Sequence, residues 1–237
     1  MQLLQPDTSY HIFNHANGFE NIFRKEENYY FFLEKYWLYI SPIAETYAYC
    51  LMPNHFHLVV RIRKREVIAE LIRNNNFSKV SNLEKSNRVN QYEFDKTKSV
   101  NFGKVKNRVE DREIEKYLSK QFANLFSCYT QSFNKVYNRM GSLFIKNFKR
   151  EPIFNKTYFL NVIVYTHRNP IHHGFCKSFE QWEYSSYNNI VNGVQNLTET
   201  SKLLKLAGGM DSFIELHQRA FENYTATYDL EIPHSHD

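Results

Sequence analysis

The sequence predicts an α+β fold in which helices pack on an antiparallel sheet. A strand-like segment at 9–14 is followed by an amphipathic helix over 26–40 and then by two adjoining strand segments within 46–63. Two further helices follow, over 114–138 and from about 156 to 169. Paired strands followed by a run of helices are typical of α+β proteins, in which the sheet is antiparallel.

The composition supports a folded domain. The chain has 237 residues, of which 42% are hydrophobic and 16% aromatic, which is too apolar for a disordered protein. Only 7 glycines and 6 prolines are present, so a fibrous or low-complexity protein is excluded. The net charge of +5 permits an anionic partner without requiring one. We expect a single domain over 1–237, with a polar insertion at about 74–113 and a C-terminal helical extension at about 195–237.

The cysteines and the hydropathy favour a cytoplasmic protein. Cys50, Cys128 and Cys176 are widely separated and form no Cys-x-x-Cys pair, so we expect buried thiols rather than disulfides or a zinc site. The first residues show no signal-peptide pattern, and no stretch approaches eighteen apolar residues. The sequence therefore predicts no membrane partner.

The first strand and helix have clear end signals. The strand 9–14 reads SYHIFN and is followed by an Asn-Gly turn signal. Over 26–40, apolar residues recur at Tyr29, Leu33 and Tyr36, and Ser41-Pro42 is expected to end this helix.

The segment 46–63 carries an unusual pattern. Its two halves, TYAYCLM and HFHLVVRI, are expected to be strands that join or kink at Pro53-Asn54. In the second half, Phe56, Leu58, Val60 and Ile62 fall on one face because strand side chains alternate. The opposite face carries two histidines, His55 and His57.

The rest of the chain is less regular. The segment 74–113 is Asn-rich and polar and keeps no period, so it is expected to be peripheral to the core. The segment 139–151 is basic. Asn155 is a candidate N-cap for the helix that Pro170 is expected to end, and a last helix is expected near 210–224.

Two pairs of residues could carry chemistry together. A His-x-His pair on a strand points both imidazoles the same way, so His55 and His57 could bind one metal ion. Tyr165 and Asn169 are four residues apart on a helix and therefore share a face. A phenol there could act as a nucleophile and the amide could supply a further metal ligand. Tyr158 lies seven residues earlier on the same face and is a rival for the same role.

In combination these features resemble the REP-associated tyrosine transposases, a branch of the single-strand transposases with a His-hydrophobic-His motif and one catalytic tyrosine. The similar stretches occur in the same order and at similar spacing, and they read YHIFNHANGFENIF, AYCLMPNHFHLVVRI, SCYTQSFNKVYNRMGSLFIKNFKR, VIVYTHRNPIHHGFC and WEYSSY. The resemblance covers most of the chain except 74–113.

The resemblance implies a fold and a mechanism. The fold is a ferredoxin-like (RRM-like, HUH endonuclease) sheet of four or five antiparallel strands with helices on it. His55, His57 and Asn169 match the metal ligands, with Mg²⁺ or Mn²⁺ as the ion, and Tyr165 matches the nucleophile. The enzyme would nick and rejoin single-stranded or hairpin DNA through a 5′-phosphotyrosine, at hairpin-forming repeats, as a monomer or a homodimer.

The remaining basic and histidine residues receive simpler interpretations. His11 and His15 flank the first strand and are expected to be structural, although they could lie near the site. Two alternatives stay open, a non-catalytic nucleic-acid-binding protein of the same fold and a replication- or relaxase-type nickase. Six basic residues are expected to contact DNA, namely Arg61, Arg63, Arg139, Lys146, Lys149 and Arg150.

Overall fold

The computed structural model of the chain describes residues 3–74, 109–194 and 197–222. Within these residues a four-stranded antiparallel sheet has the order β2-β3-β1-β4. Its strands are β1 (Ser9–His15), β2 (Ala44–Met52), β3 (His55–Ile62) and β4 (Lys149–Ile153).

The topology is that of a ferredoxin-like fold. Helix α1 (Glu26–Tyr39) connects β1 to β2, and α4 (Asp111–Val136) lies in the connection from β3 to β4. This β-α-β-β-α-β order, with β1 between β3 and β4, is the split βαβ arrangement. The predicted α+β class and antiparallel sheet are therefore confirmed, with four strands in the described part of the chain.

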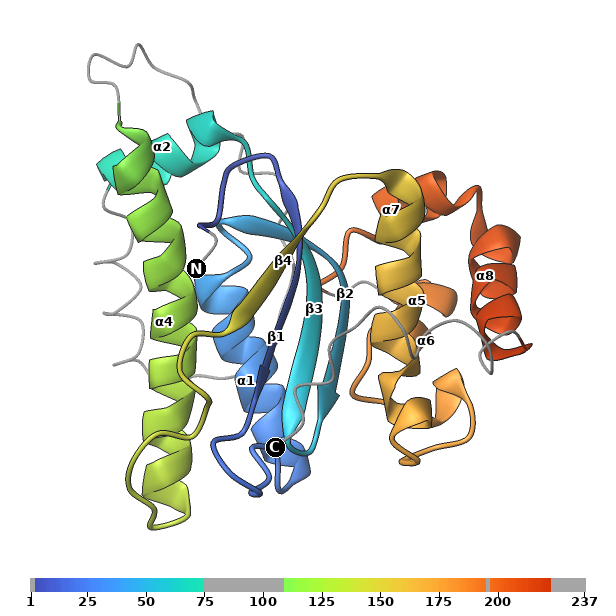
Figure 1. Ribbon diagram of the computed structural model, residues 1–237, viewed down its shortest axis with the longest axis horizontal. Coiled ribbons are helices and arrows are strands. Elements are labelled where there is room, and N and C mark those ends of the chain that lie inside the picture. Colours follow the sequence, from blue (N-terminus) through green and yellow to red (C-terminus); the bar gives the residue numbers. More distant parts are fainter. Residues whose placement is uncertain (1–2, 75–108, 195–196, 223–237) are drawn as a thin grey trace.

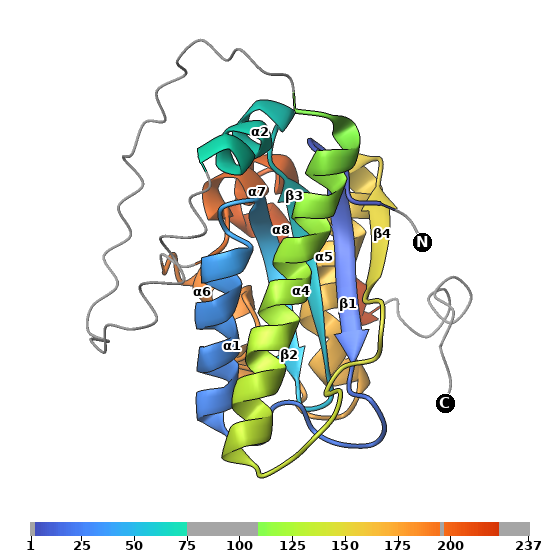
Figure 2. The same ribbon diagram turned by 90° about the vertical axis from the view of Figure 1, so that its left-hand side faces the viewer.

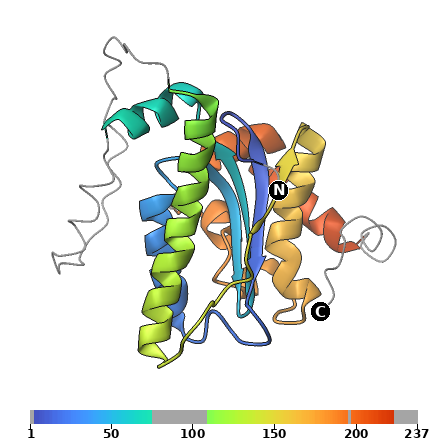
Figure 3. The ribbon, with the colours of Figure 1, turned by 60° about the vertical axis from the view of Figure 1, so that its left-hand side comes forward.

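Helices cover both faces of the sheet. Helices α1 and α4 lie on one face, and α5 (Lys156–His172) packs on the other, against β2 and β3 (Figure 1, Figure 3). Figure 2 views the sheet through the layer of α1 and α4. Helix α2 (Arg65–Asn74) packs on α4. The remaining elements on the α5 side are η1 (Phe179–Gln181), α6 (Tyr187–Val191), α7 (Thr200–Ala207) and α8 (Met210–Glu222).

The sheet divides the buried apolar residues into two clusters. Phe56, Leu58 and Val60 of β3 belong to the cluster under α1 and α4, whereas Val59 belongs to the cluster under α5. This alternation confirms the two faces expected from the sequence. The face that carries the histidines is therefore the one that α5 covers.

The ends of α5 differ in how well they were predicted. Asn155 caps the helix as expected, because its side chain accepts a hydrogen bond from the Tyr158 N–H at 2.8 Å. Pro170, however, lies inside the helix, which continues to His172. A proline in the last turn removes only one backbone hydrogen bond, and the N–H groups of His173 and Phe175 bond back to the turn at Asn169 and Pro170.

Other element boundaries also differ from expectation. Strand β4 begins in the basic segment 139–151, for which no strand was predicted, and α4 begins at Asp111 rather than at 114. Helices α2 and α6 were not predicted, whereas α7 lies within the expected C-terminal helical extension. Most of the expected insertion, residues 75–108, and the tail after residue 222 lie outside the described residues.

None of the described helices combines the length and the hydropathy needed to cross a membrane. All three cysteines are free thiols. Cys50 is buried as expected, but Cys128 and Cys176 are only half-buried.

Candidate functional site

Four histidines line the sheet face beneath α5. In β1 and β3, residues with odd numbers share this face, and the register places His15 opposite His55 and Phe13 opposite His57. The rings of His15 and His55 stack with centroids 4.5 Å apart, and those of His55 and His57 meet edge-on at 5.3 Å. The two central strands therefore build one continuous imidazole cluster.

Helix α5 brings Tyr165 and Asn169 onto this cluster. The Tyr165 ring meets the rings of His57 and His11 edge-on, with centroid distances of 5.5 and 5.9 Å. One turn later, the Asn169 side chain lies near His55 and acts to raise its pKa, and its Nδ2 donates to the Tyr165 carbonyl at 3.1 Å. All four residues expected to form the site, from β3 and α5, thus lie together.

A neighbour holds one ring nitrogen of each β3 histidine. Nδ1 of His55 lies 2.7 Å from Oδ1 of Asn54, and Nδ1 of His57 lies 2.9 Å from Nε2 of His11. If Nδ1 carries the proton in both rings, Nε2 is the nitrogen with a lone pair for a metal. Metal-binding histidines commonly have such a partner on the other nitrogen, because it sets the tautomer and the ring orientation.

Burial keeps these imidazoles neutral. The cost of burying a charge lowers the pKa of His55 to about 2, and the nearby His15 and His173 act in the same direction. Burial likewise lowers the pKa of His11 to about 3 and holds the pKa of His57 well below its usual range. Neutral imidazoles can bind a metal without first losing a proton.

The donor set fits a divalent ion with open coordination positions. Among residues 3–74, 109–194 and 197–222, no three histidine, cysteine or carboxylate side chains group closely enough to hold a metal by themselves. An ion at this site would need the Asn169 amide oxygen as the third protein ligand beside His55 and His57. Two nitrogens and one oxygen suit Mn²⁺ better than Mg²⁺, which prefers oxygen ligands.

Tyr158, the rival nucleophile, lies at the other end of α5. It is 41% exposed and sits in the first turn. Seven residues of helix separate it from Tyr165, or about 10 Å along the axis. Tyr165 is the tyrosine in ring contact with the histidines.

The prediction from the sequence missed some residues at the site and gave others only a structural role. His11 and His15 were expected to be structural, yet both contact the β3 histidines. The His173 ring lies 4.9 Å from that of His55, and Glu151 of β4 stands opposite His11 in register. His11 and His15 are four residues apart in the first strand, and this spacing alone would have placed them on one face. The pairing of β1 with β3, however, cannot be predicted from the local sequence.

The basic residues expected to contact DNA fall into two groups. Lys146 and Lys149 are exposed, and Arg61 is partly exposed and donates to the Asp7 carboxylate at 3.0 Å. Arg63 donates to the Ser41 carbonyl through Nε and Nη2. Their role in binding DNA stays a prediction.

Arg139 and Arg150 have extensive intramolecular contacts. The Arg139 guanidinium pairs with Glu20 and donates to the carbonyl of Ser142. The Arg150 guanidinium lies over the Phe148 ring, 4.1 Å from its centroid, on the sheet face that α4 covers. A DNA contact by either residue also stays a prediction.

Comparison of the sequence with known protein families finds no match, and comparison with curated proteins finds none either. Among solved structures, a similar chain is a REP-associated tyrosine transposase bound to a REP hairpin. The two chains are 13% identical, the match covers 83% of this chain and 87% of that one, and the TM-score is 0.46.

Proposed function

We propose that this protein is a metal-dependent endonuclease and strand transferase for single-stranded DNA, with Tyr165 as the nucleophile. The observation that carries the proposal is the contact of the Tyr165 ring with His57, together with the Asn169 side chain on His55. A phenol beside a neutral, metal-competent imidazole pair is suited to attack on a phosphodiester. The sequence resemblance to REP-associated tyrosine transposases points to the same reaction.

The proposed step balances without a further reactant. The Tyr165 oxygen forms a bond to phosphorus, and the bond from phosphorus to the 3′-oxygen breaks. The phenol loses its proton, and the departing 3′-oxygen gains a proton to become a hydroxyl. The downstream strand stays attached to Tyr165 through its 5′-phosphate. Because one phosphodiester replaces another, a second 3′-hydroxyl can reverse the step and join strands without ATP.

His55, His57 and Asn169 would hold the metal. A divalent ion supplies positive charge that stabilises the phosphate oxygens as they gain charge in the transition state. The protein's own part is to present two neutral Nε2 atoms and to keep Tyr165 beside them. We expect Mn²⁺ to support the reaction at least as well as Mg²⁺.

His11 has a positioning role in this proposal. Its Nε2 can accept the Nδ1–H of His57, and this leaves His57 Nε2 available for the metal. Its ring also contacts Tyr165, so it packs against both the proposed metal ligand and the proposed nucleophile. The substrate class is single-stranded or hairpin DNA.

A covalent-adduct assay tests the proposal. Hairpin-containing single strands, labelled at either the 5′ or the 3′ end, are incubated with the protein and Mn²⁺ and separated under denaturing conditions. The 3′-labelled fragment should migrate with the protein, and the adduct should vanish with a chelator or with Tyr165→Phe. Tyr158→Phe is the matched control and should retain the adduct.

The alternatives give other results. Binding of the hairpin with no adduct under any metal condition would favour a non-catalytic nucleic-acid-binding protein. An adduct that survives in Tyr165→Phe but is lost in Tyr158→Phe would make Tyr158 the nucleophile and contradict the site proposed here.

A further inference from the structure

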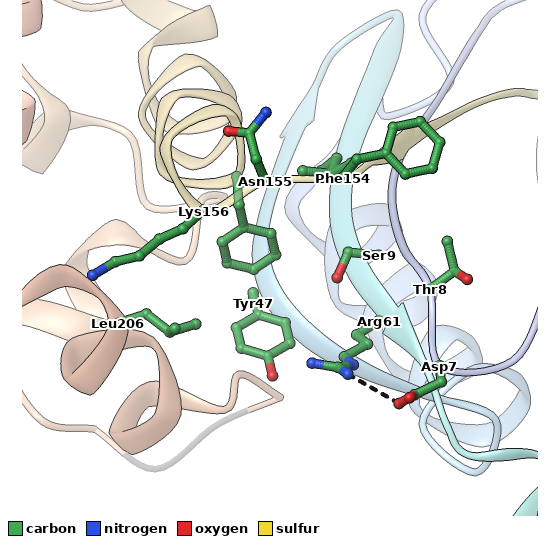
Figure 4. A pocket seen from close by; sticks show the side chains of 11 residues that line it. Asp7, Thr8, Ser9, Tyr47, Arg61, Phe154, Asn155, Lys156 and Leu206 are labelled. Atoms are coloured by element: carbon green, nitrogen blue, oxygen red, sulfur yellow. Dashed lines mark hydrogen bonds and ion pairs between the residues drawn. The ribbon is translucent and has the colours of Figure 1, made fainter.

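A second concave site lies at the start of α5, on the same side of the sheet as the histidines. It is a cavity of about 370 Å³ between the beginning of β1, the end of β3 and the first turn of α5. Figure 4 shows Phe154 on the β1 side of this cavity and Lys156 and Leu206 on the opposite side, with Tyr47 and Arg61 between them.

The cavity lies on the same face of the sheet as the histidine cluster. Ser9 lines the cavity and His11 contacts Tyr165, and these residues are two apart on one face of β1, about 7 Å by strand rise. On β3, Arg61 and His57 share that face and are about 13 Å apart. Both places therefore lie on one face of β1 and β3, within about 13 Å of each other along the strands.

The walls of the cavity include three aromatic rings. Tyr47 and Phe159 meet edge-on with centroids 5.0 Å apart and form an apolar wall. Phe154 is 81% exposed, although it follows directly after β4. A ring held at the mouth of a cavity with a free face is suited to stack on a base.

An exposed ion pair supplies hydrogen-bonding groups at the same place. The Arg61 Nη2 donates to Asp7 at 3.0 Å, and the two side chains are 45% and 55% exposed, so the pair is weak and can exchange partners (Figure 4). Asp7 has a left-handed backbone with φ of 57°, held by its N–H bonding to the Ile62 carbonyl at 3.1 Å. Together they present several donors and one anionic acceptor, the groups that recognise base edges.

We propose that this cavity binds one unstacked nucleobase of the DNA strand whose phosphate reaches Tyr165. Phe154 stacks on the base, Arg61 and Asp7 contact its edge, and Lys156 pairs with an adjoining phosphate. The proposal rests on the proposed function for the presence of DNA, and it adds a base-binding site on the same face of the sheet as the proposed nucleophile.

Equilibrium binding tests the proposal in a Tyr165→Phe background, which removes covalent chemistry. The probes are two fluorescein-labelled single strands of about 20 nucleotides, one of random sequence and one fully abasic, so that both carry the same phosphates. Phe154→Ala should weaken binding of the random-sequence strand about 5- to 100-fold and leave binding of the abasic strand unchanged. Tyr30→Ala, which removes an exposed aromatic side chain from α1 on the other face of the sheet, is the matched control and should alter neither.

A second variant separates base recognition from charge. Arg61→Gln should weaken binding of the random-sequence strand more than that of the abasic strand, whereas Lys156→Gln should weaken both equally. Equal losses on the two strands for Phe154→Ala, or no loss on either, would overturn the proposal. So would wild-type-like preference for the random-sequence strand in the double variant Phe154→Ala/Arg61→Gln.

The proposed function can fail separately. Base-dependent binding through Phe154 with no tyrosine adduct would leave the cavity assigned and refute the strand transferase. An adduct at Tyr165, together with DNA binding in which Phe154 and Arg61 make no difference between the random-sequence and abasic strands, would support the proposed enzyme. The same result would refute base binding in the cavity.

Discussion

A single contact, between Nε2 of His11 and Nδ1 of His57 at 2.9 Å, decides which nitrogen of His57 can face a metal. His11 is buried, so no water replaces this partner easily. If His57 donates from Nδ1, its Nε2 keeps the lone pair that a metal needs. In that tautomer, the residue that orients the proposed metal ligand is on β1, whereas the proposed ligand itself is on β3.

Substitution of His11 tests this dependence. His11→Leu should lower the affinity for Mn²⁺ about 10- to 100-fold, because His57 loses its acceptor. His11→Gln should restore much of that affinity, since an amide oxygen can accept the same hydrogen bond. Mn²⁺ affinity is measured directly by electron paramagnetic resonance of the free ion, with no DNA present. Equal affinity in the Leu and Gln variants would mean that His11 only fills space.

At this scale, the sequence predicts the residues of the site better than their partners. His55 and His57 alternate within one strand, and Tyr165 and Asn169 are one helical turn apart, so local periodicity places each pair on a face. The partnership of His11 with His57 spans 46 residues and depends on strand register. No local pattern encodes that register.

A chain of hydrogen bonds fastens the C-terminal helices to the element that carries Tyr165. His217 of α8 can donate from Nδ1 to the Phe213 carbonyl, so its Nε2 accepts from Nδ1 of His167 on α5 at 2.9 Å. His167 Nε2 then accepts from the Ser186 hydroxyl at 2.7 Å, which in turn accepts from the Tyr49 N–H. Both imidazoles are buried and must stay neutral for this order of donors and acceptors to hold.

These hydrogen bonds of His167 and His217 predict that the folded protein loses stability in acid. Burial lowers the pKa of His217 to about 4 and holds that of His167 well below its usual range, whereas both titrate near 6.5 when unfolded. The unfolded chain therefore binds more protons as the pH falls from about 6.5 to about 4. As the pH falls through this window, the free energy of unfolding should decrease by up to about 1.4 kcal/mol per pH unit for each histidine. Above the window, the contribution of both histidines to stability is fully present.

Urea unfolding at a series of pH values measures this effect. His217→Leu should cost about 1–3 kcal/mol near neutral pH, because it leaves the buried Nδ1 of His167 without its acceptor. The stability of the same variant should depend less on pH than that of the wild type, since one of the buried histidines that titrate in this window is gone. Parallel pH profiles for the two proteins would contradict this account.

Strand β4 was missed because its sequence carries no apolar alternation. Strand β4 reads KREPI, which is charged and contains Pro152. It forms because it is an edge strand that pairs only with β1 in the described sheet, and an edge position tolerates both charge and proline. Pro170 was wrongly expected to end α5, because a proline in the last turn of a helix costs little stability.

For the molecule as a whole, the position of positive charge matters more than its total. The net charge is only +5. Lys149 is exposed on β4 and stands opposite Phe13 in register, so it lies on the face that carries the histidines. In the proposed function, a cation there can contact the phosphate backbone of a DNA strand that reaches Tyr165.

The salt dependence of DNA binding measures that contact. Lys149→Gln should weaken binding of single strands of any sequence and reduce the slope of log affinity against log salt by about 0.7, the value for one lost phosphate contact. Lys149→Arg keeps the charge and should keep the slope. Fluorescence anisotropy titrations at increasing NaCl give both slopes, and an unchanged slope in Lys149→Gln would remove Lys149 from the interface.

The order of the strands along the chain also bears on how the protein is made. During translation His11 leaves the ribosome first, then His55 and His57, and Tyr165 and Asn169 follow only after β4 has been synthesised. A truncated or nascent polypeptide that ends before α5 lacks the proposed nucleophile altogether, however well its sheet has formed. A ribosome translating this gene close to DNA would therefore release none of the proposed nicking activity before α5 has been synthesised.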